Sequence, residues 1–577
     1  MTWNICGAMP REKTTMPPIK QELTKALAAA LKEALGLGEA PADMESTFET
    51  PREERFGDIS TNVVLRLAKE LKKSPRELAD KTCAALDSFL ERSGLKGRIS
   101  KVAVEGPGFI NFYYSAEEIA RVLLKIKEEG ESFGKPKNLK AKNVLLEFVS
   151  ANPTGPLTVA HGRQAALGDS LARILRFRGH RVTTEYYNND EGVQIDTLGK
   201  STHLRCREIL TGKKLEIPEN FYRGDYLTGL AQRLLDEKGE AFKKCGEEEQ
   251  MRLCADFAKD NILQGIKKDL KDFGVAFDGY FSQAALMKSG KVEKALETLK
   301  QKGFVYEKDG AVWFESTRLG DDKDRVLVKS DGSYTYLMPD IAYHENKFSR
   351  GFESLIDILG PDHHGYIPRI KASAEALGFS RNALDILIAQ LVTLYEGEKQ
   401  VRMSTRAGEF VTLREIMDEV GKDAGRFFFV MRKFDAHLDF DLALAKSQTP
   451  DNPVFYIQYA HARVESIKGV NRERGGGMPS PEKAKLSLLT NPYEVRVMRL
   501  LAQYEDVIAA AERTLEPYRL VPYLMDLAAD FHRFYTENRV ITEDAPLTDA
   551  RLLLIDCVQA VLRSGLNLLG VSAPVKM

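Results

Sequence analysis

Apolar residues in the first part of the chain follow a helical period and then a strand-like one. Between Ile19 and Leu37 they recur three and four residues apart, which predicts an amphipathic helix. Two further helices are predicted from about Thr61 to Leu71 and from Arg76 to Glu91, and two strands from Ile99 to Val104 and from Phe109 to Tyr114. This order predicts a compact α+β domain that ends near Phe133.

The pattern changes after a lysine-rich linker, Lys135 to Lys142. Val144 to Val149 is an apolar run broken only by Glu147, as expected for a strand buried on both faces. A Pro- and Gly-rich loop follows, then a helix with its apolar residues on one face, and then a strand from Val182 to Tyr187. This order of elements predicts the start of a doubly wound α/β sheet.

The stretch from about Gly192 to Phe281 interrupts the α/β pattern with charged helical segments, and we interpret it as an insertion. Strand-like runs resume beyond it, and from Val411 to Met577 the chain is mostly helical again. The strand-like runs are Ala311–Glu315, Arg325–Lys329, Tyr334–Met338, Leu355–Leu359 and Leu384–Leu391.

Composition narrows the class of protein. The 83 basic and 84 acidic residues nearly cancel, so a nucleic-acid partner would be bound through local basic patches. The six cysteines show no Cys-x-x-Cys spacing, which argues against a thiolate zinc site and for reduced thiols in a cytoplasm. No apolar run is long enough to cross a membrane.

The loop after the first buried strand carries the first candidate chemistry. Ligands of an open α/β sheet bind beyond the carboxyl ends of its strands, and the amino end of the next helix favours phosphate. His161 lies there, where an imidazole can donate a hydrogen bond to a phosphoryl oxygen. From its position alone, His161 could equally serve only to cap the helix.

The segment Pro156–Arg163 (Pro-Leu-Thr-Val-Ala-His-Gly-Arg) resembles the His-Ile-Gly-His motif of class I aminoacyl-tRNA synthetases. Thr158 takes the place of the first histidine and Ala160 that of the glycine, whereas His161 keeps the second histidine. The longer string Glu147–Leu157 resembles the arginyl branch of that family in particular.

A second motif of that family is a Lys-Met-Ser-Lys loop that clamps the triphosphate. Arg402–Gly408 (Arg-Met-Ser-Thr-Arg-Ala-Gly) resembles it, with Thr405 in place of the second lysine. Our hypothesis is that Arg402 stabilises the leaving pyrophosphate, assisted by Arg406 or Lys399. Without the upstream motif, this segment would be interpreted as a solvated basic turn.

A third segment, Gly360–Tyr366, follows the predicted strand Leu355–Leu359 and therefore lies at the same edge of the sheet. His363 and His364 are adjacent on a turn and have no third ligand at a useful spacing, so we do not interpret them as metal ligands. The resemblance implies ATP binding by Thr158, His161, Gly162, Gly360, Asp362, His363, His364, Arg402, Met403 and Ser404, and catalysis by His161, Thr158, Arg402 and Ser404.

A site that selects arginine requires fixed acceptors, preferably carboxylates, because a guanidinium is always charged and presents five donors. Tyr336 and Asp340 are expected across a strand-to-helix turn at the ligand edge. The resemblance implies that this pair recognises the guanidinium and that Glu147, Ser150 and Asn152 hold the rest of arginine. From its position alone, Asp340 could be only an acid at a helix N-terminus.

The flanking regions also resemble arginyl enzymes. Phe56-Gly57-Asp58 with Asn62, and Pro107–Asn111, resemble their N-terminal tRNA-binding domain, and Phe455–Ser466 resembles the start of their anticodon-binding domain. The resemblance implies tRNA binding by Phe56, Asn62, Tyr459 and Arg463. Aromatic residues at helical spacing are, however, usually core residues.

The resemblance therefore implies a multidomain α/β protein. It has a class I Rossmann-type catalytic domain with a helical insertion, an N-terminal α+β tRNA-binding domain and a C-terminal all-α anticodon-binding domain. The predicted ranges are a disordered leader at 1–16, the N-terminal domain at 17–134, the catalytic domain at 135–410 with its insertion at about 192–281, a helical connection at 411–452 and the anticodon-binding domain at 453–577. Met16 is an alternative start to Met1.

The implied activity is the ATP-dependent attachment of L-arginine to its tRNA through arginyl-adenylate. The resemblance further implies Mg²⁺ but no zinc, a monomer in the cytoplasm without a membrane, and adenylate formation only when tRNA is bound. A synthetase for another amino acid such as cysteine would need a thiol-selecting zinc site, for which the cysteine spacing offers no ligands. A paralogue that only binds tRNA is the other alternative, because both nucleotide motifs have lost a charged residue.

Overall fold

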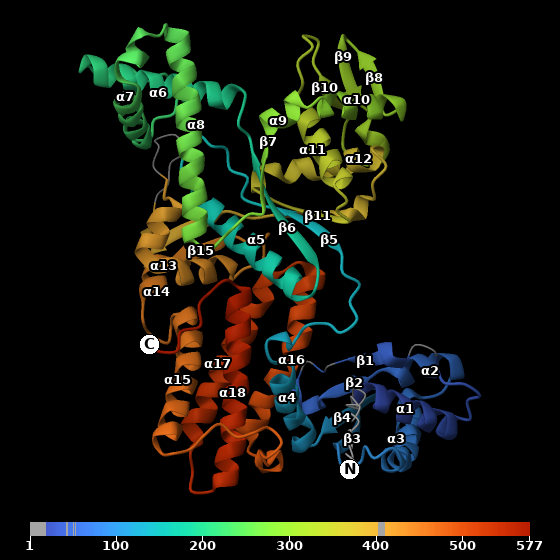
Figure 1. Ribbon diagram of the computed structural model, residues 1–577. Coiled ribbons are helices and arrows are strands. Elements are labelled where there is room, and N and C mark those ends of the chain that lie inside the picture. The colour runs from blue at the N-terminus through green and yellow to red at the C-terminus, as the bar shows by residue number, and fades with distance from the viewer. Residues whose placement is uncertain (1–18, 42–43, 50, 52, 398, 402–409) are drawn as a thin grey trace, which may run out of the picture. The chain divides into compact units, whose positions relative to one another are not determined.

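The computed structural model describes residues 19–577 except 42–43, 50, 52, 398 and 402–409 (Figure 1). Arg402, Met403, Ser404, Thr405 and Arg406 therefore lie outside the described residues. The chain divides into two compact units. The first unit comprises residues up to 128 together with 478–502 and 540–554, and the second comprises 129–477, 503–539 and 555–577.

The first unit contains a four-stranded sheet in the order β1-β2-β4-β3, in which every pair of neighbours is antiparallel. The predicted helix from Ile19 and the predicted strand Phe109–Tyr114 are confirmed. The elements are α1 (Ile19–Leu35), β1 (Phe48–Glu49), β2 (Ile59–Thr61), α2 (Val63–Leu71), α3 (Pro75–Arg92), β3 (Ile99–Glu105), β4 (Phe109–Tyr114) and α4 (Ala116–Glu129).

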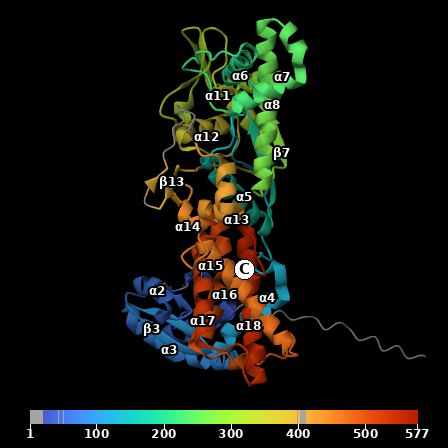
Figure 2. The same cartoon turned by 90° about the vertical axis from the view of Figure 1, so that its left-hand side faces the viewer.

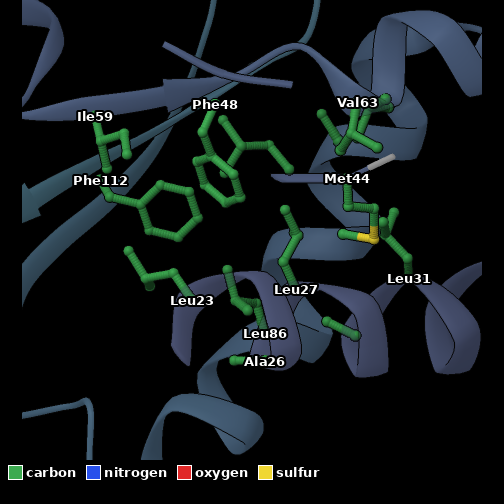
Figure 3. Packing of buried hydrophobic residues seen from close by; sticks show 14 of the residues in the cluster. Leu23, Ala26, Leu27, Leu31, Met44, Phe48, Ile59, Val63, Leu86 and Phe112 are labelled. Atoms are coloured by element: carbon green, nitrogen blue, oxygen red, sulfur yellow. The ribbon is translucent and has the colours of Figure 1, made fainter. Parts of the chain in front are cut away.

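The core of this unit forms where α1 faces the sheet (Figure 3). Leu23, Leu27 and Leu31 are fully buried on one face of α1, since residues four apart stack on a helix. They meet Leu86 from α3 and Phe112 from β4. Burial of each such side chain contributes about 1.5–3 kcal/mol, so the apolar period seen in the sequence stabilises the unit.

The second unit is built on a five-stranded parallel sheet in the order β12-β11-β5-β6-β7. From β5 the chain continues to β6 and β7 on one side, whereas β11 and β12 lie on the other. The strand order thus reverses between β5 and β11, where open α/β sheets bind ligands. The strands are β5 (Asn143–Glu147), β6 (Arg181–Asn188), β7 (Gly279–Ser282), β11 (Ser354–Leu359) and β12 (Leu384–Ile388).

The range predicted as an insertion forms three helices that pack on one another, α6 (Val193–Thr211), α7 (Tyr226–Lys244) and α8 (Glu247–Asp272) (Figure 2). The insertion was expected to extend to Phe281, but the last residues of this range are not part of the helical insertion. These residues form β7, which pairs with β6 and completes the sheet. The single polar and aromatic run Gly279–Ser282 is too short to show a strand period, so the pattern did not reveal it.

Two predicted strands are wrong in part. Tyr334–Met338 is not a strand: Tyr334 forms an isolated bridge with Val328, and α11 (Leu337–Ser349) begins three residues later. Pro339 lies in the first turn, where its missing N–H breaks no helical hydrogen bond. The run Leu384–Leu391 ends as a strand at Ile388, and a new strand, β13 (Val392–Glu396), follows.

The second unit contains further helices and strands. They are α5 (Val159–Phe177), α9 (Gln283–Lys288), α10 (Lys291–Gln301), β8 (Val305–Lys308), β9 (Ala311–Phe314), β10 (Arg325–Val328), α12 (Ile367–Ala376), β14 (Lys399–Gln400), α13 (Leu413–Val430), β15 (Leu438–Asp441), α14 (Leu442–Lys446), α15 (Pro453–Glu473) and α17 (Leu520–Glu537). Two long helices, α16 (Pro492–Thr514) and α18 (Ala545–Leu568), run through both units. Among the described helices, none is long and apolar enough to cross a membrane.

Candidate active site

The chain turns sharply after β5. Ser150 donates its N–H to the carbonyl of Phe148 at 2.9 Å, which closes a γ-turn around Val149. Val149 has φ +68° and Ser150 φ +38°, values that cost roughly 1–3 kcal/mol for a residue other than glycine. The turn brings the Ser150 hydroxyl back to donate to Oε1 of Glu147 at 2.9 Å. Strain is thus held where the predicted ligand edge begins.

Three carboxylates lie in one row across the centre of the sheet. The register pairs Glu147 of β5 with Asp357 of β11 on one side and with Glu185 of β6 on the other. Residues in register on neighbouring strands point to the same face, so these side chains stand next to one another. All three are buried, with at most 6% of their surface exposed.

Helix α11 covers this row and brings the matching cations. Lys347 donates to Oε2 of Glu147 at 2.5 Å and to Oδ1 of Asp357 at 2.7 Å. Arg350, at the end of the helix, holds both oxygens of Glu185 at 2.6 and 2.8 Å. A bidentate guanidinium–carboxylate pair of this kind is among the stronger hydrogen-bonded arrangements.

His344 joins the same network. Its Nε2 lies 2.8 Å from Oδ2 of Asp357 and its Nδ1 lies 2.7 Å from the carbonyl oxygen of Asp340. Both partners are acceptors, so each contact is a hydrogen bond when the ring nitrogen concerned carries its proton. Burial alone would raise the pKa of Asp357, but Lys347 and His344 outweigh it and lower that pKa.

Asp340 is a fourth carboxylate, and it has no cation of its own. Its side chain makes no hydrogen bond or ion pair with any part of the chain that the structure describes. Burial, together with the charges of Glu147 and Asp357, raises the pKa of Asp340 to about 7, against the opposing effect of His344 and Lys347. An unpaired carboxylate next to three neutralised ones can accept a cationic ligand.

The other residues predicted to hold arginine lie around this carboxylate at different depths. Tyr336 is the N-cap residue of α11 and is 71% exposed. Asn152 is half-buried and donates from Nδ2 to Gln194 at the start of α6, at 2.7 Å. Tyr187 faces the same carboxylates. Burial and the charges of Asp340 and Glu147 raise the pKa of its phenol.

His161 is in the first turn of α5, as predicted. The N–H of Thr158 donates to its Nδ1 at 3.1 Å, so the other nitrogen, Nε2, carries the ring proton. Burial lowers the pKa of His161 to about 4, although Asp362 opposes the shift. His161 therefore caps its helix through Nδ1 and is also a neutral hydrogen-bond donor through Nε2. Helix capping and the predicted hydrogen bond to a phosphoryl oxygen are thus compatible.

The chain just after the undescribed segment 402–409 pairs with the start of this helix. Val159 donates to the carbonyl of Val411 at 3.1 Å, and Leu413 donates to that of Leu157 at 2.8 Å, around an antiparallel bridge between Thr158 and Thr412. The chain thus returns from the undescribed segment 402–409 directly against the start of α5. Helices α5 and α13 begin at this bridge and pack against each other (Figure 1).

Gly162 is needed at this packing contact. A Cβ at its position would lie 2.8 Å from Leu413 and 3.1 Å from Phe429, both from α13. Close approach of the two helices thus accounts for the glycine without a ligand. Its predicted contact with ATP stays a prediction.

Arg163 anchors the same helix from within. It is fully buried and donates to four main-chain carbonyls, those of Gln390, Leu391, Lys433 and Ala436, at 2.7–3.3 Å. Burial lowers its pKa to about 10, so it remains charged at neutral pH. Arg163 thus connects the start of α5 to two separate stretches of main chain, 390–391 and 433–436.

The third predicted segment follows β11 at the switch point of the sheet. Pro361–Tyr366 forms a 3-10 turn after Gly360. His364 is exposed, and the Asp362 side chain is 79% exposed with Nε2 of His363 at 3.4 Å. Asp362 is close enough to His161 to oppose the shift in its pKa, and the predicted contact of this segment with ATP stays a prediction.

Phe56 and Asn62, the residues of the first unit predicted to contact tRNA, lie on either side of a tight turn at Gly57. Gly57 has φ +91°, and a Cβ there would lie 2.6 Å from the carbonyl oxygen of Phe112, so only glycine fits. Phe56 is half-buried with the Arg55 guanidinium 4.7 Å from its ring centre. Asn62 precedes α2 without capping it through its side chain, and its buried Oδ1 has no hydrogen-bond partner among the residues that the structure describes.

The predicted tRNA residues of the second unit belong to an aromatic stack between α15 and α17. The Tyr459 ring lies 6.1 Å from Phe455 at 12° and 5.8 Å from His532 at 26°. The Arg463 guanidinium lies 4.9 Å from Tyr459 and 5.3 Å from Tyr535, which is 36% exposed. The stack is half-buried, so it is core on one side and surface on the other.

Comparison with known proteins connects this geometry to one family. Residues 122–433 match the family described as tRNA synthetases class I (R), catalytic domain, which is more than half of the chain. The arginine–tRNA ligase of Syntrophotalea carbinolica is 46% identical over 97% of this chain and 99% of its own. The chain belongs to the arginyl-tRNA synthetases. It therefore attaches arginine to tRNA for translation and uses ATP, and a synthetase for another amino acid is excluded.

The flanking regions of this arginyl-tRNA synthetase agree. Residues 21–114 match the arginyl-tRNA synthetase N-terminal domain, and residues 457–577 match the DALR anticodon binding domain. The arginine–tRNA ligase of Desulfosudis oleivorans is 48% identical over 96% of this chain and 98% of its own. These matches confirm the predicted fold class in all three parts.

Solved structures show the same fold. An arginyl-tRNA synthetase from Campylobacter jejuni has a TM-score of 0.73 and 37% identity, covering 80% of this chain and all of its own. The Thermus thermophilus arginyl-tRNA synthetase has a TM-score of 0.71 and 23% identity, covering 97% of this chain and all of its own.

Sequence reasoning missed most of the charge network of the synthetase. Asp357 interrupts a strand that is otherwise largely apolar, the same signal that singled out Glu147, whereas Glu185 lies in a strand of mixed polar and aromatic residues. On α11, Asp340, His344 and Lys347 follow a spacing of four and three, which places them on one helical face. A search for charges at register positions of buried strands would have found these residues.

Proposed function

We propose that Asp340 receives the guanidinium of arginine in this synthetase. The observation that carries the proposal is that Asp340 is the carboxylate of the site left without a partner among the described residues. A guanidinium offers two parallel N–H donors to such a group. Lysine would supply charge but only a single point of contact, leaving a buried acceptor unpaired, so it would be rejected.

We assign the remaining arginine contacts to residues around this carboxylate. Tyr336 lies one helical turn before Asp340 and is assigned to the guanidinium as well. Glu147 and Ser150, at the turn after β5, and Asn152 are assigned to the α-amino and α-carboxylate end. Arginine would thus lie along the switch point, between β5 and the start of α11.

We assign the ATP side to the start of α5 and the turn after β11. His161, as a neutral Nε2–H donor, would stabilise the α-phosphate as charge develops there. An arginine carboxylate oxygen attacks the α-phosphorus in line, and the bond to pyrophosphate breaks, giving arginyl-adenylate. The ribose of the tRNA 3′ end then attacks the mixed anhydride and releases AMP. The other residues assigned to ATP are Thr158, Gly162, Gly360, Asp362, His363 and His364.

The leaving pyrophosphate is assigned to the segment that includes Arg402, Met403 and Ser404, with Arg406 or Lys399 assisting. Lys399 is exposed on β14, and the N–H of Val401 donates to the carbonyl of Leu394 on β13 at 2.9 Å. Separate Arg402→Ala and Arg406→Ala variants test this assignment through the rate of adenylate formation. Wild-type rates in both would contradict it.

We further propose that tRNA contacts Phe56 and Asn62 in the first unit and Tyr459 and Arg463 in the second. The unpartnered Oδ1 of Asn62 and the exposed edge of the aromatic stack support these assignments. Aromatic faces stack on unpaired bases, and a guanidinium contacts either bases or phosphates.

The finer physiological statements are also proposals. Mg²⁺ would enter with ATP, whose phosphates supply the oxygen ligands that this ion prefers. Among the described residues, no group of three or more His, Cys, Asp and Glu side chains is arranged to hold a metal. We propose that the synthetase works as a monomer in the cytoplasm and that tRNA is required for arginine activation. We also propose the domain ranges predicted above, with the insertion ending before β7.

ATP–pyrophosphate exchange with arginine, measured with and without tRNA, tests the proposal as a whole. Exchange only in the presence of tRNA is the expected result. Exchange without tRNA would contradict the tRNA requirement, and no exchange under either condition would favour a protein that only binds tRNA.

A further inference from the structure

The row of carboxylates under α11 contains one fully buried cation. Lys347 has no exposed surface, and its Nζ lies within 2.7 Å of both Glu147 and Asp357. The same ammonium lies 4.3 Å from the centre of the Tyr343 ring. These neighbours enclose it, so Lys347 does not reach the pocket where a substrate would bind.

We propose that Lys347 is a positioning residue, which fixes the Glu147 carboxylate so that it receives the α-ammonium group of arginine. This inference rests on the proposed function, in which Glu147 belongs to the arginine pocket. It assigns to Lys347 a role in choosing the amino-acid end of the substrate rather than in the chemistry itself.

The sheet creates the need for such a residue. Neighbouring strands lie about 4.8 Å apart, and the register places Glu147 between Asp357 and Glu185. Without a cation, adjacent carboxylates would repel one another, and one would take up a proton and become a poorer acceptor. Burial alone would lower the pKa of Lys347, but Asp357 and Glu147 outweigh it and raise that pKa, so the ammonium persists.

The contacts of Glu147 leave room for one more donor. Lys347 occupies Oε2, and the Ser150 hydroxyl donates to Oε1 at 2.9 Å. A carboxylate offers about four lone-pair positions, so a third donor still finds an acceptor. Arginine has two cationic ends, and because the guanidinium is assigned to Asp340, the α-ammonium is left for Glu147.

The test compares two ligands that differ only in that ammonium group. δ-Guanidinovalerate is arginine without its α-amino group, and its inhibition constant is measured alongside the KM values for arginine and ATP. In full-length Lys347→Met with tRNA, we expect the KM for arginine to rise about tenfold or more, while the other two constants stay within about twofold. Equal losses for both ligands, or no loss for either, would contradict the proposal.

Two matched variants accompany it. Lys347→Arg keeps the charge and is expected to retain a KM for arginine closer to that of the wild type. Lys300→Met removes an exposed lysine from α10, which packs on α11, and is expected to change nothing. A Lys347→Arg enzyme as impaired as Lys347→Met would mean that charge is not what positions Glu147.

A double variant distinguishes a failure of the positioning role from a failure of the arginine pocket. It leaves only Asp357 to lose the Lys347 ammonium, and Asp357 keeps its contact with His344. If Lys347 acts through Glu147, Glu147→Gln/Lys347→Met has the same KM for arginine as Glu147→Gln alone, whereas multiplied effects would contradict this route. An unchanged KM in Glu147→Gln would overturn the proposed arginine pocket itself. A raised KM in Glu147→Gln beside a wild-type KM in Lys347→Met would overturn only the positioning role.

Discussion

The two halves of the candidate active site treat charge in opposite ways. Under α11, four carboxylates are gathered at the edge of one sheet with Lys347, Arg350 and His344, and Asp340 is left without a partner among the described residues. At the start of α5, His161 is neutral, and the buried Arg163 donates to main-chain carbonyls rather than to carboxylates. The difference matches the ligands proposed for each half.

A cation is selected by a carboxylate already in place, since a buried charge needs a fixed partner. A triphosphate brings its own charge, so polar donors and helix N-termini suffice on the protein side. Variants in the two halves should therefore change different kinetic constants and respond differently to pH.

The largest effect is expected on the ATP side. His161→Ala removes the Nε2–H donor, so kcat should fall about 10²–10³-fold, with little change in the KM for arginine. Single-turnover formation of the adenylate measures this, with His161→Asn as a variant that keeps a side-chain donor. A rise in the KM for arginine at constant kcat would break the proposed division between the halves.

On the arginine side, Asp340→Asn should raise the KM for arginine about 100-fold, because truncating a buried charge pair costs about 2–5 kcal/mol. The KM for ATP should stay close to its wild-type value. Aminoacylation assays compare the variant with Asp309→Asn, a change in an exposed turn. Equal shifts in both KM values would count against the assignment of Asp340.

The pH dependence sharpens the contrast. The pKa of Asp340 is raised to about 7, and its ionised form binds arginine, so the KM for arginine should fall about tenfold between pH 6 and pH 8. The groups facing Asp340 are Glu147, His344, Lys347, Asp357, Tyr187 and Tyr366. The KM for ATP should stay flat over this range, because the pKa of His161 is about 4. A parallel slope for both substrates would be inconsistent with the comparison.

The smallest effect concerns stability without substrate. Folding raises the pKa of Asp340. The contribution of its protonated carboxyl to the unfolding free energy is therefore complete below the unfolded pKa near 4 and is lost as pH rises through 7. Asp340→Asn should therefore match the wild type at pH 4 and exceed its unfolding free energy by about 1 kcal/mol at pH 8, after allowing for solvent screening. Urea titrations at the two pH values measure this, and a variant less stable at pH 8 would argue against a strained carboxylate.

The sequence predicted the elements with clear periods and missed those set by long-range pairing. The apolar run before Val149 and the helix after His161 were identified because each has enough residues to show its period. Strand β7 was hidden at the end of an apparent insertion, since its four residues become a strand only through β6. The run Tyr334–Met338 was assigned a strand because its aromatic and apolar residues favour one, whereas tertiary packing starts α11 there.

Site residues followed the same division. Glu147 and His161 stood out locally, as a charge in an apolar run and as part of a motif. Lys347 contacts Glu147 across a separation of 200 residues in sequence, and Arg350 contacts Glu185 across one of 165. No local pattern specifies such register.

The anchor at Arg163 has an evolutionary consequence. It holds four carbonyl oxygens, and every amino acid presents the same oxygen from its main chain. Gln390, Leu391, Lys433 and Ala436 can therefore drift freely in side chain, provided the backbone keeps its path. Selection would fall on one arginine alone, and a search for co-varying pairs would find no partner for it.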